Sequence, residues 1–209
     1  MKGLNYKLEG EVFTLLPERA IFWERESAII ISDLHLGKAG HFRKHGIPIT
    51  KKVHHMDLRI VEALLNEYPI KEVILLGDLF HSYENNEWLD FIRFMEVFSH
   101  VNFILVKGNH DILESYPDAL KVVDRLTRSN FCFTHEMEKT KEYNISGHIH
   151  PGFRIRGIAR EGLTLPCFYF SKEHAVLPAF GQFTGLKKIR PKDGDKIFGI
   201  AENDVIELV

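Results

Sequence analysis

The feature that most constrains this chain is a short apolar run that ends in two side chains able to bind metal. Residues 28–31 (Ala-Ile-Ile-Ile) are continuously apolar and mostly β-branched, as expected of a strand buried on both faces. Asp33 and His35 follow at positions i and i+2, so on a strand or its extension both side chains point the same way. A carboxylate and an imidazole aimed together can hold one divalent cation. Taken alone, the pair is equally compatible with a polar loop that closes a strand.

The combination of an apolar run and a polar ending recurs along the chain. Apolar residues at helical spacing between the first three runs predict helices over residues 50–68 and 85–99. This alternation indicates βαβ units, which gather ligands at the carboxyl ends of parallel strands. The polar clusters are, in order, Asp33-x-His35, Gly77-Asp78, Gly108-Asn109-His110-Asp111, His135 and Gly147-His148-x-His150.

The rest of the chain reads as strands. Residues 11–16 and 19–23 flank a turn at Pro17 and predict a hairpin. After Pro117 the pattern changes to short strand-like runs separated by turn signals, with no long helix. These runs fall at residues 121–127, 131–134, 143–146, 153–159, 163–170, 175–177, 196–200 and 205–208.

Composition narrows the class of protein. The chain has 209 residues, 44% hydrophobic residues and a net charge of -2, which is typical of a globular protein and argues against wholesale coating of nucleic acid. We find no stretch long enough to span a membrane and no signal peptide, so we expect a cytoplasmic protein with no membrane partner. Cys132 and Cys167 are expected to be reduced core residues. The twelve histidines stand out, because histidine is the commonest metal ligand.

The mixture of donors at the strand ends suggests a reaction class. Two-metal phosphoesterase sites hold ions roughly 3.5–4 Å apart, which stabilise the attacking and leaving oxygens of an in-line displacement. Such ions need a bridging carboxylate and mixed nitrogen and oxygen ligands on each side. Carboxylates, an amide and several imidazoles suit Mn, Fe, Zn or Ni better than Mg or Ca. We therefore expect two divalent transition-metal ions, with Mn preferred.

The ordered clusters resemble those of the calcineurin-like metallophosphoesterase superfamily. Nearly the whole chain also resembles the bacterial DNA-ligase-associated, ICC-like phosphoesterase group. The resemblance implies one domain over residues 1–209, built as a four-layer αββα sandwich of two mixed sheets with a two-metal site at one edge. The closer resemblance rests on Asp33-Leu34-His35-Leu36-Gly37-Lys38, Gly77-Asp78-Leu79-Phe80-His81, Leu165-Pro166-Cys167-Phe168 and Leu177-Pro178-Ala179-Phe180-Gly181-x-Phe183-Thr184-Gly185.

The resemblance also implies roles for single residues. Asp33, His35 and His150 would bind the first ion, and Asp78 would bridge the two. The second ion would be held by Asn109, His135 and His148. The family often places Gly beside the histidine at position 135, whereas this chain has Thr134-His135-Glu136. Many members also carry an acidic residue shortly after Gly-Asp, where this chain has His81, to which we assign a supporting hydrogen bond.

His110 and Asp111 are the predicted catalytic residues. By the resemblance, His110 would protonate or electrostatically stabilise the leaving oxygen, and Asp111 would hold its ring. Asp111 could also cap a following helix, and the two roles are not exclusive. Lys38 and Arg43 are expected to line the mouth and contact substrate phosphate, although an ordinary solvated basic face explains them as well. Gly77, Gly108 and Gly147 are interpreted as backbone requirements that allow unusual φ at tight strand exits.

Three functions follow in order of preference. The first is a metal-dependent phosphodiesterase, a DNA-repair nuclease acting on single-stranded DNA alongside a DNA ligase and helicase. The second is a phosphomonoesterase or nucleotide phosphatase, which would use the same two ions. The third is a non-catalytic scaffold for protein contacts; degenerate scaffolds lose ligands, whereas this chain keeps them all.

Overall fold

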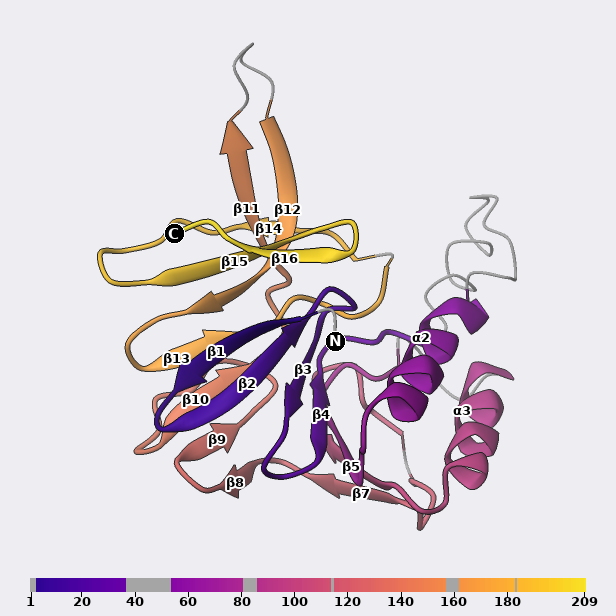
Figure 1. The fold of residues 1–209 in the computed structure, drawn as a ribbon. Coiled ribbons are helices and arrows are strands. Elements are labelled where there is room, and N and C mark those ends of the chain that lie inside the picture. Colours follow the sequence, from indigo (N-terminus) through magenta and orange to yellow (C-terminus); the bar gives the residue numbers. More distant parts are fainter. Residues whose placement is uncertain (1–2, 37–53, 81–85, 114, 157–161, 183) are drawn as a thin grey trace.

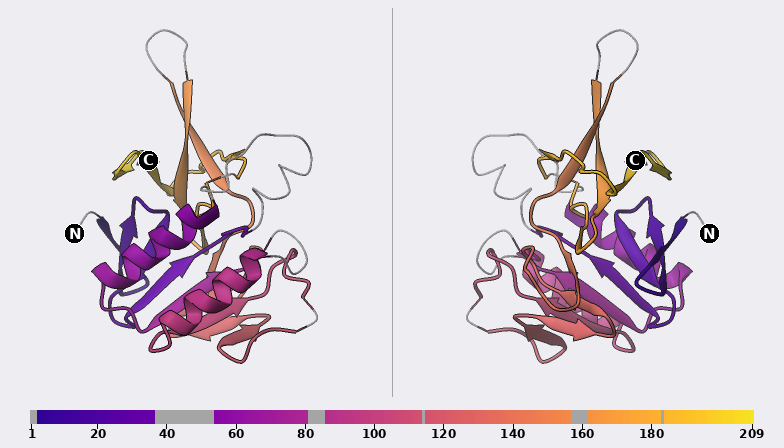
Figure 2. Two further views of the ribbon diagram at one scale, coloured as in Figure 1. Left: turned by 90° about the vertical axis from the view of Figure 1, so that its right-hand side faces the viewer. Right: turned by 90° about the vertical axis from the view of Figure 1, so that its left-hand side faces the viewer.

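A computed structural model describes residues 3–36, 54–80, 86–113, 115–156, 162–182 and 184–209. Two mixed β-sheets pack on one another, and two helices, α2 (His54–Glu67) and α3 (Asn86–Val97), lie side by side against the outer face of the first sheet (Figures 1 and 2). The two mixed sheets of the expected sandwich are confirmed. In the described part of the chain the layers are helix, sheet and sheet, and residues after Pro117 contribute no helix there, as their sequence indicates.

Among the described residues, the first sheet has seven strands in sequence order. The first to fourth strands form an antiparallel meander that includes the predicted hairpin, and the fourth to seventh strands run parallel, so the fourth strand belongs to both parts. The parallel part is the predicted succession of βαβ units. The strands are β1 (Leu4–Leu8), β2 (Glu11–Leu16), β3 (Ala20–Trp23), β4 (Ala28–Ile31), β5 (Glu72–Leu76), β6 (Asn102–Val106) and β7 (Leu120–Val123).

The part of the chain that the structure describes contributes nine strands to the second sheet. Its path is β14-β11-β12-β13-β10-β9-β8, and β15 pairs with β12 and β16. The hairpin of β11 and β12 projects beyond the body of the molecule (Figures 1 and 2). The strands are β8 (Leu126–Arg128), β9 (Phe131–Phe133), β10 (Tyr143–Ser146), β11 (Pro151–Arg156), β12 (Gly162–Phe170), β13 (His174–Val176), β14 (Lys187–Lys188), β15 (Lys196–Ala201) and β16 (Asp204–Glu207).

One predicted strand is wrong. Residues 121–127 were expected to form a single run, but the structure divides them between β7 of the first sheet and β8 of the second. Asp124 and Arg125 separate the two strands, so the chain crosses between sheets at this polar break.

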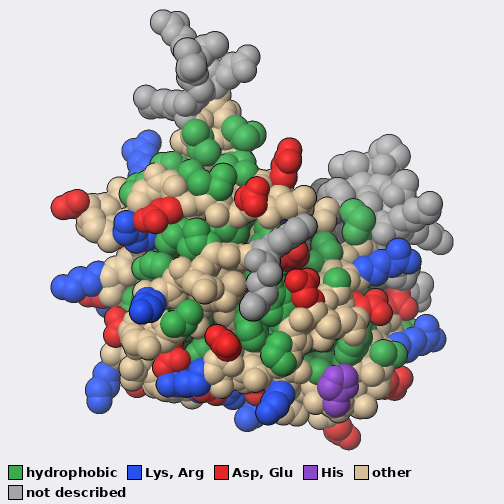
Figure 3. All heavy atoms as spheres, viewed as in Figure 1, with side chains coloured by type: hydrophobic (Ala, Val, Ile, Leu, Met, Phe, Trp, Pro, Cys, Tyr) green, Lys and Arg blue, Asp and Glu red, His purple; other side chains and the backbone are tan. Residues whose placement is uncertain are grey.

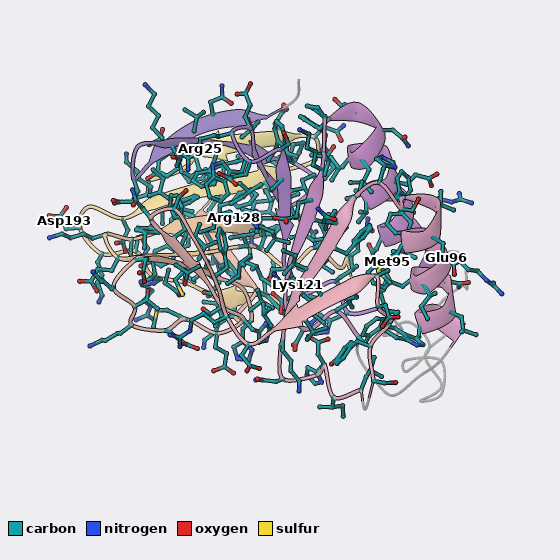
Figure 4. The ribbon with its side chains drawn as sticks, turned by 90° about the horizontal axis from the view of Figure 1, so that it is seen from below. Arg25, Met95, Glu96, Lys121, Arg128 and Asp193 are labelled. Carbon is teal, nitrogen blue, oxygen red and sulfur yellow. The ribbon has the colours of Figure 1, made fainter. Side chains whose placement is uncertain are left out.

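The apolar runs are explained by burial on two faces. In β4, Ile29 and Ile31 pack toward the helices, whereas Ala28 and Ile30 pack toward the second sheet. A strand with core on both sides has no polar face, so its sequence does not alternate. Seen from below, the helices flank the first sheet, and the buried Met95 lies on the side of α3 that faces the strands (Figure 4).

The surface gives a mixed electrostatic picture. On the face seen in Figure 3, Lys and Arg side chains are interspersed with Asp and Glu side chains. Within the described residues, neither helix is long and apolar enough to cross a membrane.

Arg19 and Asp57 lie beside a loop that contacts the first polar cluster. Arg19, at the turn between β2 and β3, donates hydrogen bonds from Nη1 to the carbonyls of Ala179 (3.3 Å) and Gly181 (3.4 Å). The backbone amide of Gly181 in turn donates to the carbonyl of Asp33 at 3.2 Å.

Asp57 of α2 is 9% exposed, and burial raises its pKa to about 7. The charge of Arg19 and a backbone hydrogen bond at Gln182 oppose this shift of the pKa.

The raised pKa of Asp57 predicts that the free energy of unfolding depends on pH. Between about pH 4 and pH 7 the folded protein keeps a proton on Asp57 that the unfolded chain loses, so the free energy of unfolding should fall as pH rises, by at most about 1.4 kcal/mol per pH unit. Asp57→Asn should remove this slope. Urea unfolding of both proteins in EDTA at pH 4.5, 6 and 8 measures it, with the exposed Asp118→Asn as control. A wild-type minus Asp57→Asn difference that does not vary with pH would contradict the assignment.

Candidate metal centre

The carboxyl ends of neighbouring parallel strands bring the first polar clusters together. Strand β4 lies beside β5, and the pairing continues past the strand ends. The backbone amide of Asp33 donates to the carbonyl of Gly77 (3.2 Å), and that of His35 donates to the carbonyl of Asp78 (2.9 Å). These two backbone hydrogen bonds extend the pairing of β4 and β5 beyond the strands and bring Asp33 and His35 beside Asp78. The sequence predicts this proximity for side chains at adjacent strand ends.

Three histidines that follow strands of the second sheet lie at the same site. His135 follows β9, and His148 and His150 follow β10, which pairs with β9 in parallel. The backbone amide of His148 donates to Oδ2 of Asp33 at 2.9 Å. The site is therefore assembled from both sheets. The carboxylate of Asp33, from the first sheet, accepts a hydrogen bond from a backbone amide of the second sheet.

Asp33, His35 and His150 form one group that could hold a metal ion. Their ligand atoms lie within 4.8 Å of one another. Asp33 Oδ1 is 3.2 Å from His150 Nε2 and 4.0 Å from His35 Nε2. The three side chains converge on one point from two sheets, which is the arrangement that a shared cation requires.

The environment of Asp33 fits a cation. The residue is 0% exposed, and Oδ1 accepts no hydrogen bond from the described residues. Burial raises the pKa of Asp33, but interactions with His150 and with the hydroxyl of Ser32 outweigh burial and hold the pKa below its usual value. A buried, ionised carboxylate with an uncommitted oxygen is costly unless a positive charge joins it.

Asp78, His135 and His148 form a second group, with ligand atoms again within 4.8 Å of one another. His135 Nδ1 lies 2.9 Å from the carbonyl of Leu76, so we assign the ring proton to Nδ1. This leaves the lone pair on Nε2, which lies 3.3 Å from Asp78 Oδ1 and 3.1 Å from His148 Nδ1.

Asp78 lies between the two groups. Its Oδ2 is 3.9 Å from His35 Nε2 of the first group, and its Oδ1 is 3.3 Å from His135 Nε2 of the second. One carboxylate thus offers an oxygen to each side, which is the geometry that its predicted bridging role needs. Each group combines carboxylate oxygen with imidazole nitrogen, a donor set that suits transition metals.

The two predicted catalytic residues lie in the loop after β6. The side chain of His110 is 49% exposed, and its Nε2 lies 3.9 Å from Asp78 Oδ2. The carboxylate of Asp111 is buried and accepts from the backbone amides of Gly108 (2.8 Å), Leu79 (2.9 Å) and Phe80 (3.3 Å). Asp111 therefore ties the loop after β6 to the loop after β5.

The expectation that Asp111 caps a helix is wrong, because the described residues 111–113 and 115–119 form no helix. Burial raises the pKa of Asp111, while the amide of Gly108 opposes this shift. The expectation that Asp111 orients the ring of His110 stays a prediction.

The backbone at the site is strained. Five of the predicted metal ligands adopt positive φ, between 49° and 69°. Non-glycine residues in this left-handed region cost roughly 1–3 kcal/mol each and cluster at functional sites. Asp and His are among the residues that tolerate it best. These residues are Asp33, His35, Asp78, His148 and His150.

The glycines at the strand exits have two different roles. Gly77 has φ of 74°, as predicted. Gly108 and Gly147 do not have positive φ, so that part of the expectation is wrong. A Cβ at Gly108 would lie 2.6 Å from Asp78 Oδ1, and one at Gly147 would lie 2.5 Å from Asp33 Oδ2. These two positions need glycine because a carboxylate passes against the backbone.

Asn109 contacts a residue that the sequence did not single out. Asn109 donates from Nδ2 to Oε1 of Glu136 at 2.6 Å, and Glu136 was not predicted as a site residue. The only signal for it was the departure from the family pattern after His135. Lys38 and Arg43, predicted at the mouth, and His81 lie outside the described residues.

Comparisons with known proteins point to one superfamily. A family model described as calcineurin-like phosphoesterase matches residues 27–169. The crystal structure of Pseudomonas putida nuclease MPE superposes with a TM-score of 0.84 at 27% sequence identity, covering 99% of this chain and 100% of that chain. No curated protein matches the chain at a significant level. The predicted resemblance to the superfamily is confirmed.

The close approach at Gly147 yields a prediction. In Gly147→Ala the added methyl group would collide with the Ser32 hydroxyl and displace Asp33, so Mn²⁺ affinity should fall about tenfold or more. Overpacking should also lower the free energy of unfolding by about 1–3 kcal/mol. Calorimetric Mn²⁺ titration and urea unfolding measure both effects. Gly185→Ala is the control, since no atom lies within 4 Å of its added Cβ. Wild-type metal binding in Gly147→Ala would contradict this account.

Proposed function

The chain belongs to the calcineurin-like phosphoesterase family, and from this premise we propose that it is a binuclear metal-dependent phosphodiesterase that cleaves single-stranded DNA. The observation that carries the proposal is the pair of Asp and His groups that share the Asp78 carboxylate. The family and the nuclease neighbour support a hydrolase acting on phosphoric ester bonds.

The residues of the centre divide into two ligand sets. Asp33, His35 and His150 would hold one ion, and His135, His148 and Asn109 the other, with Asp78 shared. When bound, such a pair of ions supplies Lewis-acid stabilisation of the attacking and leaving oxygens in an in-line displacement at phosphorus. The donor set favours a transition metal, and we propose Mn, with Fe, Zn or Ni as substitutes.

His110 has the position of a general acid in this proposal. Its side chain is half exposed and Nε2 faces the shared carboxylate at 3.9 Å, so a phosphate ester seated over Asp78 would contact it. Nε2 would then deliver a proton to the leaving oxygen or stabilise its charge. The backbone amide of His110 donates to Asp78 Oδ1 at 3.0 Å, which fixes the start of the side chain.

Two observations favour a nucleic-acid substrate. The structural neighbour that spans the whole chain is named a nuclease. The backbone of β14, which carries the exposed Lys187 and Lys188, adjoins the centre, where the amide of Lys187 donates to the carbonyl of His150 at 3.0 Å. A basic side chain that reaches the site from this strand would attract the phosphate backbone. From the resemblance to the ligase-associated group, we propose that this activity serves cytoplasmic DNA repair alongside a DNA ligase and helicase.

A substrate and metal matrix tests the proposal. The protein is reconstituted with Mn, Mg, Zn or Ni and assayed on bis-nitrophenyl phosphate, nitrophenyl phosphate and single-stranded DNA. We expect Mn-dependent cleavage of the diester and of DNA, abolished by EDTA. Hydrolysis of the monoester alone would replace the proposal by a phosphomonoesterase, and no hydrolysis with any metal would leave a non-catalytic scaffold.

The same assay separates His110 from the ligands. His110→Ala should retain metal and lose roughly 10²–10⁴ in turnover on DNA. The loss should be smaller on bis-nitrophenyl phosphate, because nitrophenolate leaves without a proton. His100→Ala removes an exposed histidine after α3 and serves as the matched control. Metal loss in His110→Ala, or equal losses on both substrates, would contradict the acid role.

A further inference from the structure

A carboxylate that the family pattern does not supply lies at the rim of the second group. Glu136 directly follows His135, and its side chain is 53% exposed. Oε1 accepts a hydrogen bond from Asn109 Nδ2 at 2.6 Å and lies 3.7 Å from His148 Nε2. Glu136 thus contacts two of the residues proposed to hold one ion, and it comes from the same turn as a third.

The turn that carries Glu136 is fixed by buried hydrogen bonds. Thr134 donates from Oγ1 to the carbonyl of Glu136 at 2.6 Å. The buried side chain of Asn144 donates to Thr134 Oγ1 at 2.8 Å and accepts from the amide of Glu138 at 3.2 Å. The backbone on both sides of Glu136 is therefore held from the core, which fixes where its side chain begins despite the exposure of the carboxylate.

The first consequence concerns the amide of Asn109. An Asn side chain can be placed in two orientations that exchange oxygen and nitrogen. With a carboxylate oxygen 2.6 Å from one end, that end must be the NH₂ group, because an amide oxygen there would face a negative oxygen. The carbonyl oxygen, which is the atom able to bind a cation, is thereby left on the other side.

The second consequence concerns the ring of His148. Its Nδ1 points inward, 3.1 Å from His135 Nε2, and its Nε2 points outward toward Glu136. A carboxylate beside Nε2 favours the tautomer with the proton on Nε2, which leaves the lone pair on the inward Nδ1. Carboxylates that orient histidine in this way are common partners of metal sites.

We propose that Glu136 is a positioning residue that orients Asn109 and His148 toward one ion of the centre. The inference rests on the proposed function, because it assigns that ion to the group of Asp78, His135 and His148. Glu136 does not contact the ion itself; it acts through the two ligands. The negative charge of Glu136 also lies close enough to His148 to attract a cation bound on the opposite side of the His148 ring.

Calorimetric titration with Mn²⁺ alone tests the inference without substrate. Glu136→Ala should weaken one of two binding steps by about 10–100-fold and leave the other unchanged. Glu136→Gln keeps an acceptor for the Asn109 amide but loses the charge, so its affinity should lie between those of wild type and Glu136→Ala. Glu138→Ala is the matched control, because it removes the same charge two residues along, where the carboxylate pairs with Arg125.

A double-mutant cycle shows whether Glu136 acts through Asn109. Asn109→Ala should weaken the same step, and adding Glu136→Ala should cost less than it does in wild type, because residues that act as a unit are not additive. Additive losses, a Glu136→Gln variant as weak as Glu136→Ala, or unchanged binding in Glu136→Ala would overturn the inference. Wild-type protein that binds no Mn²⁺ would instead overturn the proposed function.

Discussion

Two carboxylates, those of Asp33 and Asp78, lie buried among imidazole rings where the two sheets meet. Burying ionised groups costs several kcal/mol unless charge or hydrogen bonds compensate. Backbone amides supply part of the compensation, that of His148 at Asp33 and that of His110 at Asp78. The remainder calls for positive charge at the centre. A cation bound where the strands of both sheets end would supply this charge.

The surrounding structure holds these carboxylates in position at a conformational cost. Positive φ at five predicted ligands turns the chain sharply as each strand ends. Gly147 lets the backbone of the second sheet pass against Asp33, and Asp111 clamps two loops through their amides. The loop containing Gly181 is hydrogen bonded to Asp33 on one side and to Arg19 on the other. Strain at the site is thus balanced by many contacts outside it, as preorganised sites require.

The sequence predicts the part of this arrangement that depends on local pattern. Buried parallel strands have no polar face, so runs such as residues 28–31 reveal both the strand and the point where it ends in ligands. Strand partners are not encoded locally, so the division between β7 and β8 around Asp124 was missed, as was the edge strand β1. Glu136 was missed for the same reason: its role depends on Asn109, 27 residues away in sequence. The close approach at Gly147 likewise requires knowing that two sheets meet there.

The most direct test of this account is the anomalous difference map of a crystal grown with Mn²⁺. The account predicts two strong peaks per chain at neighbouring positions. One should lie among Asp33, His35 and His150, and the other among His135, His148 and Asn109, with Asp78 contacting both. A single peak, no peak, or an ion bound away from these side chains would contradict the claim that the two sheets meet to build a two-ion centre.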